Sequence, residues 1–167
     1  MLEYPLLFVF PAAMAFAGAM DLFTMTIPNR ISLVLVAAFA AMAPVSGLPL
    51  QTVLSHVAAG ALVLLFTFAM FARGWLGGGD AKLLAATALW LGFDNLLPYL
   101  LLTSILGGLL ALALISYRTI APPLWALGQD WAMRLHDRQV GIPYGMALAG
   151  AALLIYPSTK WFAVLAA

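Results

Sequence analysis

Residues 96–117 read LLPYLLLTSILGGLLALALISY, an unbroken run without a single charged side chain. A helix needs about 20 predominantly apolar residues to cross the hydrocarbon core of a bilayer, so this run is long enough for one crossing. The rest of the chain has the same character, because 65% of its 167 residues are hydrophobic and only 8% are charged. A soluble domain usually carries about a quarter charged residues. The composition therefore excludes a water-soluble enzyme and predicts an integral membrane protein.

Five further apolar segments lie along the chain, and breaks rich in glycine, proline or asparagine separate them. The short segments of alternating polarity that are typical of a membrane β-barrel do not occur. We therefore predict an all-α fold with about six transmembrane helices and short loops, forming a single membrane-embedded domain over residues 1–167 with no separate soluble domain. The predicted spans are Pro5–Phe23, Pro28–Pro44, Val53–Ala72, Ala81–Phe93, Leu96–Tyr117 and Pro143–Tyr156.

The basic residues predict how these helices are oriented. Six of the seven fall in the first, third and fifth loops, and only Lys160 falls on the other side. Lysine and arginine favour cytoplasmic loops, so we expect these three loops in the cytoplasm and both termini outside. A net charge of +1 gives no indication of a nucleic-acid partner. The absence of cysteine excludes disulfides, thiolate metal sites and a cysteine nucleophile. The six residues are Arg30, Arg73, Lys82, Arg118, Arg134 and Arg138.

The fifth loop is the only long one, and its apolar residues recur at helical spacing. This pattern predicts a short amphipathic helix on the inner membrane surface, which we interpret as an anchor rather than a substrate-recognition element. The apolar positions are Leu124, Leu127, Trp131 and Leu135, opposite Asp130, Arg134 and Asp137.

Ionisable residues near hydrocarbon are the informative ones in so apolar a chain. Asp94 is predicted to cap a helix at the outer surface, and the isolated His56 is interpreted as a structural residue. Asp21 and Asp80 differ from these, because each lies at the cytoplasmic end of a predicted span. The topology therefore predicts two carboxylates at the same depth on the same side of the membrane. Asp80 also closes the run Gly77–Gly79, which can approach other backbone closely.

Two neighbouring carboxylates share a proton, since like charges a few ångströms apart do not both ionise easily. The ionised carboxylate can take a proton from a water that attacks a peptide carbonyl, and the protonated one can donate to the carbonyl oxygen. This chemistry needs no metal and no cofactor. Composition alone fits a proton or cation relay in a small transporter equally well.

Three short segments carry a resemblance to a known family. Gly77-Gly78-Gly79-Asp80-Ala81-Lys82 resembles the Gly-x-Gly-Asp signature of membrane aspartyl proteases, in the form found in type IV prepilin peptidases. Asp21 followed by Ile27-Pro28-Asn29 is similar to the other catalytic segment of that family, and Gly141-Ile142-Pro143-Tyr144-Gly145 to a third. The three segments occur in order, each at a predicted cytoplasmic helix end, and the resemblance covers essentially the whole chain.

The resemblance implies an endopeptidase of the inner membrane that removes the leader of type IV pilin-like precursors, prepilins or preflagellins, at the cytoplasmic face. It implies Asp21 and Asp80 as the catalytic pair, pilin-like precursors and the lipid bilayer as partners, and no nucleic acid. The short chain is similar to the peptidases of Flp/Tad-type pili. Larger relatives carry a cysteine-bearing segment and also N-methylate their product, so we expect no methyltransferase activity here. Motif residues interpreted as scaffold are Gly77, Gly79, Lys82, Pro143 and Tyr144.

Two other classes of function compete with the peptidase. A proton relay should continue through the outer half of the membrane, where the sequence offers little beyond Ser55, His56, Thr103 and Ser104. A non-catalytic subunit of a secretion or pilus machine would not need two acids at matched depth. The sequence therefore favours the peptidase over both.

Overall fold

The structure, a computed structural model, describes residues 8–166. Within these residues it contains seven α-helices, two short 3-10 turns and no β-strand, which confirms the all-α fold. Residues 5–7 of the first predicted span lie outside the described residues. The elements are α2 (Val9–Thr24), α3 (Asn29–Met42), α4 (Leu50–Ala72), α5 (Gly78–Tyr117), η1 (Ala126–Gly128), α6 (Asp130–His136), α7 (Tyr144–Ile155), η2 (Tyr156–Ser158) and α8 (Lys160–Ala166).

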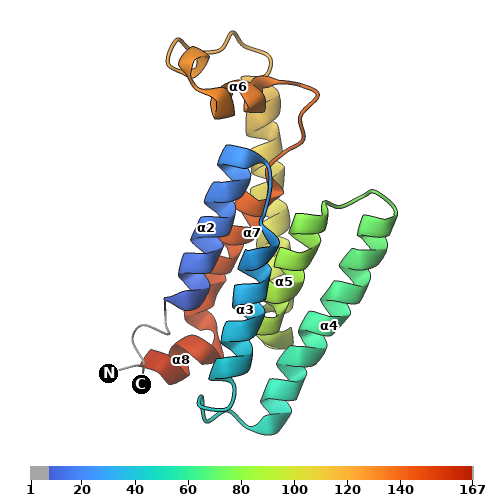
Figure 1. Ribbon diagram of the computed structural model, residues 1–167, viewed down its shortest axis with the longest axis vertical. Helices are drawn as coiled ribbons and strands as arrows, with labels where there is room; N and C mark the ends of the chain where they lie inside the picture. The colour runs from blue at the N-terminus through green and yellow to red at the C-terminus, as the bar shows by residue number, and fades with distance from the viewer. Residues whose placement is uncertain (1–7, 167) are drawn as a thin grey trace.

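A sharp reversal divides α5 into two halves at Gly92, whose backbone is non-helical with φ 64° and ψ 179°. In Figure 1 the green half of α5 descends beside α4, and the yellow half returns toward α6. A positive φ favours glycine, so Gly92 allows the chain to turn back directly from one helix into the next. The two halves correspond to the predicted spans 81–93 and 96–117. The predicted capping role of Asp94 is wrong, because Asp94 lies inside the returning helix and forms an ion pair of 2.7 Å with Lys160.

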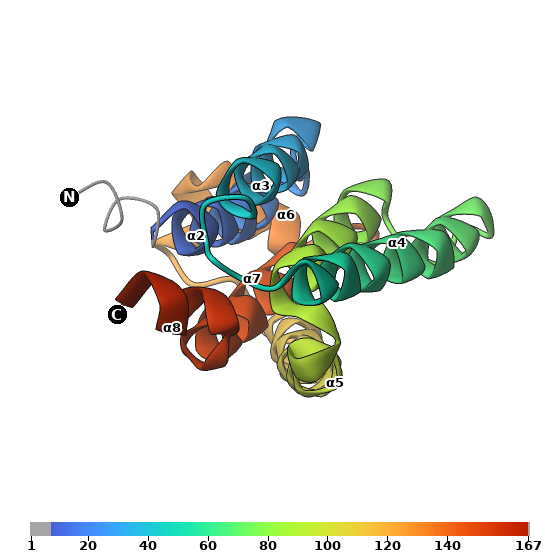
Figure 2. The same cartoon turned by 90° about the horizontal axis from the view of Figure 1, so that it is seen from below.

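Five helices form an antiparallel bundle: α2, α3, α4, α5 with its two halves, and α7 run alongside one another (Figure 1). Viewed from below, α4 stands at one edge, where it packs against α5 (Figure 2). By length and composition, α4 and α5 are both long and apolar enough to cross a membrane. Leu65, Phe66 and Phe68 of α4 are 62–70% exposed. A helix that is apolar all round favours surroundings that are apolar too.

An aromatic cluster fills the core at the end of the bundle where α5 reverses at Gly92. The indole N–H of Trp90 donates to the carbonyl of Leu35 at 2.9 Å, which ties α5 to α3. The Trp161 ring of α8 meets Phe39 in an edge-on contact and lies tilted against Trp90. His56 is buried here with its Nδ1 3.0 Å from the carbonyl oxygen of Leu89, as expected for a structural histidine.

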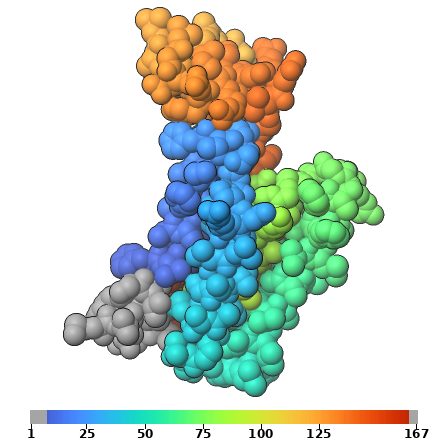
Figure 3. Space-filling view, in the orientation of Figure 1, coloured from blue at the N-terminus to red at the C-terminus, as the bar shows by residue number. Residues whose placement is uncertain are grey.

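Residues 118–142 form a cap above the opposite end of the bundle, seen in orange in Figure 3. The predicted amphipathic helix is shorter than expected, since α6 has seven residues and the preceding turn η1 has three. Its apolar side packs on protein: Leu135 is buried, and Trp131 meets Phe23 of α2 edge-on at 5.4 Å. Leu124 is 88% exposed and does not share that face. The cap therefore packs on the bundle and also exposes apolar side chains.

Candidate active site

Asp21 lies in the last turn of α2 and is buried. The chain that leads from α2 to α3 begins four residues later. Met25 ends the helix in a left-handed conformation with φ 56°, and its N–H donates to the carbonyl of Asp21 at 2.8 Å. The chain then continues through Ile27 to Pro28, which precedes the first residue of α3. This turn brings Asp21 and Ile27 to the same side of the bundle, where both line one cavity.

Asp80 lies in the first turn of α5, and Gly77 is the residue that caps this helix. The Asp80 side chain folds back toward Gly77, because a Cβ built on Gly77 would lie 2.9 Å from Asp80 Oδ2. A carboxylate in the first turn also interacts favourably with the positive end of the helix dipole. Gly77 thus leaves the space that the Asp80 carboxylate occupies.

Both carboxylates line one cavity of about 260 Å³ at the capped end of the bundle. A water molecule takes up about 30 Å³ in the liquid, so the cavity has room for water and for part of a peptide chain. Asp21 and Asp80, which are 59 positions apart in the sequence, therefore line the same cavity. The residues lining the cavity are Asp21, Met25, Thr26, Ile27, Gly77, Gly79 and Asp80.

The N–H of Gly145, at the start of α7, donates to Asp21 Oδ2 at 2.6 Å. The first amides of a helix have no partner inside it, and the dipole adds positive potential at that end. A Cβ on Gly145 would lie only 2.7 Å from Asp21 Oδ2 and 2.8 Å from Ile27 Cδ1. Gly145 therefore supplies both a donor and the space for the carboxylate. Gly145 was not among the predicted site residues, although Pro143, a typical helix start, indicates that unpaired backbone amides lie nearby.

The predicted scaffold residues divide into two groups. Gly77 and Gly79 line the cavity with the aspartates. Lys82 lies outside it, where its Nζ donates to Asn29 Oδ1 at 2.9 Å. Tyr144 lies outside it too: its ring packs on Gly107 of α5, 3.0 Å from the position of a Cβ there.

Pro143 is fully buried and precedes the first residue of α7. It therefore fixes where the helix that carries Gly145 begins. The catalytic role of Asp21 and Asp80 remains a prediction, whereas their common cavity is a feature of the fold.

Two arginines hold the cap in place, one within the cap and one between the cap and α2. Arg118 donates to the carbonyl of Leu135 in α6 at 2.8 Å and to those of Val140 and Gly141, shortly before α7, at 2.9 Å. Arg134 donates to the carbonyl of Phe23 at 2.9 Å, two residues beyond Asp21. Arg118 thus ties the first residue of the cap to its later residues, and Arg134 ties the cap to the end of α2, which carries Asp21.

The described part of the chain holds no group of three or more histidine or acidic side chains that could bind a metal ion together.

Comparison with known proteins gives two findings. Residues 8–112 match the model of the type IV leader peptidase family, and this range includes both aspartates. The chain is also 30% identical, over 151 residues, to two curated proteins of Aeromonas salmonicida, one of them from strain A449, both named prepilin leader peptidase/N-methyltransferase. The alignment covers 85% of this chain and 46% of each relative, so the chain spans about half the length of these relatives. No solved structure matches the chain.

Proposed function

Because this chain belongs to the type IV leader peptidase family, we propose that it is a membrane-embedded aspartic endopeptidase that cleaves the leader from type IV pilin-like precursors. The observation that carries the proposal is that Asp21 and Asp80 line one cavity with room for a water and a peptide group. The relatives' name supports prepilins as the substrate class.

The proposed reaction uses the two carboxylates and one water. The ionised carboxylate removes a proton from the water, whose oxygen attacks the carbonyl carbon of the scissile peptide bond. The protonated carboxyl donates its proton to the carbonyl oxygen, which gives a neutral diol. When the diol collapses, one hydroxyl proton returns to a carboxylate, the C–N bond breaks and the leaving nitrogen takes up a proton. The pair is then left with one shared proton, as at the start.

Gly145 has a positioning role in this proposal. Its N–H fixes Asp21 Oδ2, so the second oxygen of that carboxylate is the one directed to water or to the partner acid. A fixed carboxylate matters because misplacement by about 1 Å can cost about a hundredfold in rate.

We also propose that the chain crosses the inner membrane six times, with the cavity on the cytoplasmic side and both termini outside. Six basic residues support this orientation, because they belong to the cap or to helix ends at the capped side of the bundle, whereas Lys160 lies at the other side (Figure 1). Basic side chains favour the cytoplasmic face. The two long apolar helices α4 and α5 support the membrane location.

Asparagine substitutions test the proposed chemistry directly. Asp21→Asn and Asp80→Asn should each abolish cleavage of a prepilin by the purified protein in detergent, because an amide can neither share the proton nor act as a base. Asparagine is nearly the same size as aspartate, so the folded bundle should persist in gel filtration and circular dichroism.

The matched control is Asp94→Asn, at the other end of the bundle, where the carboxylate is exposed and pairs with Lys160. This variant should cleave at the wild-type rate. Near-normal cleavage by either of the other two variants would eliminate the two-aspartate mechanism.

A further inference from the structure

One residue in the turn between α2 and α3 has a backbone conformation that is unusual for its type. Met25 has φ 56° and ψ 26°, and in the part of the chain that the structure describes it is the only residue other than glycine with a positive φ. A side chain in this left-handed region crowds the following carbonyl oxygen, so glycine is the usual residue where a helix ends in this way. The chain follows that rule elsewhere, because its other positive-φ residues are Gly47, Gly74 and Gly92. Met25 therefore carries a steric cost that a glycine would not.

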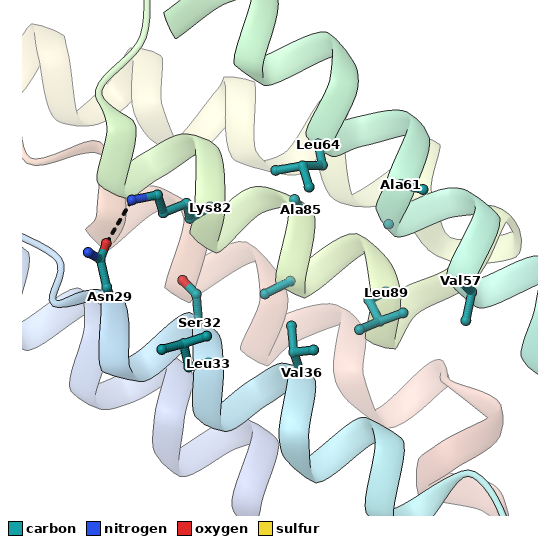
Figure 4. Close-up of a pocket in the computed structure, with 12 residues that line it drawn as sticks. Asn29, Ser32, Leu33, Val36, Val57, Ala61, Leu64, Lys82, Ala85 and Leu89 are labelled. Carbon is teal, nitrogen blue, oxygen red and sulfur yellow. Dashed lines mark hydrogen bonds between the residues drawn. The ribbon is translucent and has the colours of Figure 1, made fainter.

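The contacts on either side of Met25 keep it in this conformation. Its own N–H donates to the carbonyl of Asp21 at 2.8 Å, which completes the end of α2. At the start of α3, Lys82 Nζ donates to Asn29 Oδ1 at 2.9 Å, which ties the other end of the turn to α5 (Figure 4). Between these two bonds, the Ile27 side chain packs against the first turns of α5 and α7. A strained conformation persists where its surroundings determine it in this way, and such positions cluster at functional sites.

Met25 differs from the three glycines by its position at the candidate active site. It lines the cavity that the two aspartates share, and the three glycines do not. Met25 and Ile27 are the only lining residues with large apolar side chains, so they make up the apolar wall of this cavity. Methionine is unbranched and flexible, and its sulfur is polarisable, so it adapts to apolar groups of different shapes. Glycine at position 25 would relieve the backbone but would remove one of the two members of this wall.

We propose that Met25 is a specificity-determining residue, whose side chain contacts an apolar side chain of the substrate next to the bond that is cleaved. The proposal rests on the peptidase function proposed above. Glycine would fit the backbone better, but it would leave the substrate without this contact. If Met25 served only to end α2, glycine would do so at lower steric cost and with no effect on cleavage. The two interpretations therefore differ in what Met25→Gly does to activity.

The test compares stability with cleavage in Met25→Gly. Glycine adopts the left-handed conformation without steric cost, so this variant should unfold at the wild-type temperature or above. The probes are two pairs of prepilins, which carry leucine or alanine just before the cleaved bond in one pair and just after it in the other. The ratio of kcat/KM for leucine over alanine should fall about tenfold or more in at least one pair, because the loss of an apolar contact affects the larger side chain most.

Met20 provides the matched control, because it is a half-buried methionine of α2 that does not line the cavity. Met20→Gly should unfold at a lower temperature, since glycine is unfavourable inside a helix, and should keep the wild-type ratio. Met25→Leu should also keep the ratio to within about threefold, because leucine has a similar apolar volume.

Three outcomes decide between the interpretations. An unchanged ratio in both pairs of probes for Met25→Gly would overturn the proposal. A lower unfolding temperature of Met25→Gly, together with an equal loss on all the probes, would also overturn it, because Met25 would then act on the fold alone. Failure of the wild type to cleave any of the probes would instead contradict the peptidase function.

Discussion

Replacing Gly145 by alanine tests whether α7 holds Asp21 in place. A Cβ at this position would lie 2.7 Å from Asp21 Oδ2 and 2.8 Å from Asp21 Cβ and Ile27 Cδ1, whereas ordinary contacts begin at 3.4 Å. Either the carboxylate or the helix must therefore move by about 0.7 Å, and a displacement near 1 Å can cost about a hundredfold in rate. We expect Gly145→Ala to lower kcat for prepilin cleavage by roughly tenfold to a hundredfold.

Gly150 provides the matched control in the same helix, because a Cβ there would meet Leu106 Cδ1 at an ordinary 3.5 Å. Alanine is favoured over glycine inside a helix by about 1 kcal/mol, so Gly150→Ala should keep its activity and unfold at the same temperature or higher. The assay is the rate of appearance of the shortened pilin on a gel, with thermal unfolding of each variant in the same detergent. Wild-type cleavage by Gly145→Ala would refute the close contact between α7 and Asp21. An equal loss in Gly150→Ala would show that any change in α7 is harmful.

Three further expectations concern other parts of the molecule. Reporter fusions at Ser46 should indicate the outside and fusions at Gln129 the cytoplasm, and reversed signals would overturn the proposed orientation. Incubation with S-adenosylmethionine and a cleaved pilin should transfer no methyl group to the pilin, and stoichiometric labelling would contradict this. Arg118→Ala should reduce cleavage about tenfold, because the carbonyl of Leu135 in α6 and two carbonyls shortly before α7 lose a charged donor. Arg73→Ala removes a stacking contact with an exposed tryptophan and should not reduce cleavage.

The sequence predicted the helices and the position of the two aspartates at the same end of the bundle, because both follow from the cost of polar groups in an apolar chain. An acid at the end of a long apolar run is conspicuous, and the distribution of basic residues puts Asp21 and Asp80 at the same end of the bundle. The N–H of Gly145 was missed for a different reason. Every residue except proline carries a backbone donor, so residue type alone does not indicate which amide will meet a carboxylate.

Two local errors have physical causes that a single sequence does not reveal. At the reversal of α5, the preference of aspartate for helix caps pointed to Asp94, but Gly92 makes the turn with a positive φ and leaves Asp94 free to pair with Lys160. In the cap, helical spacing grouped Leu124 with Leu135. Periodicity identifies an apolar face but not what covers it, and here Leu135 packs on protein while Leu124 remains exposed.

The glycines of the motif segments act here by leaving space rather than by adopting unusual backbone angles. Among the described residues, the glycines with positive φ are Gly47, Gly74 and Gly92, so Gly77, Gly79 and Gly145 do not need glycine for that reason. Ile27 shows what the space is for: its Cβ lies 3.1 Å from the Cβ position of Gly79, and its Cδ1 lies 2.8 Å from that of Gly145. The same side chain thus packs between the start of α5, which carries Asp80, and the start of α7, which binds Asp21. A larger residue at position 79 or 145 would push these helix ends apart, so the spacing of the motifs follows from the packing that keeps the two carboxylates on one cavity.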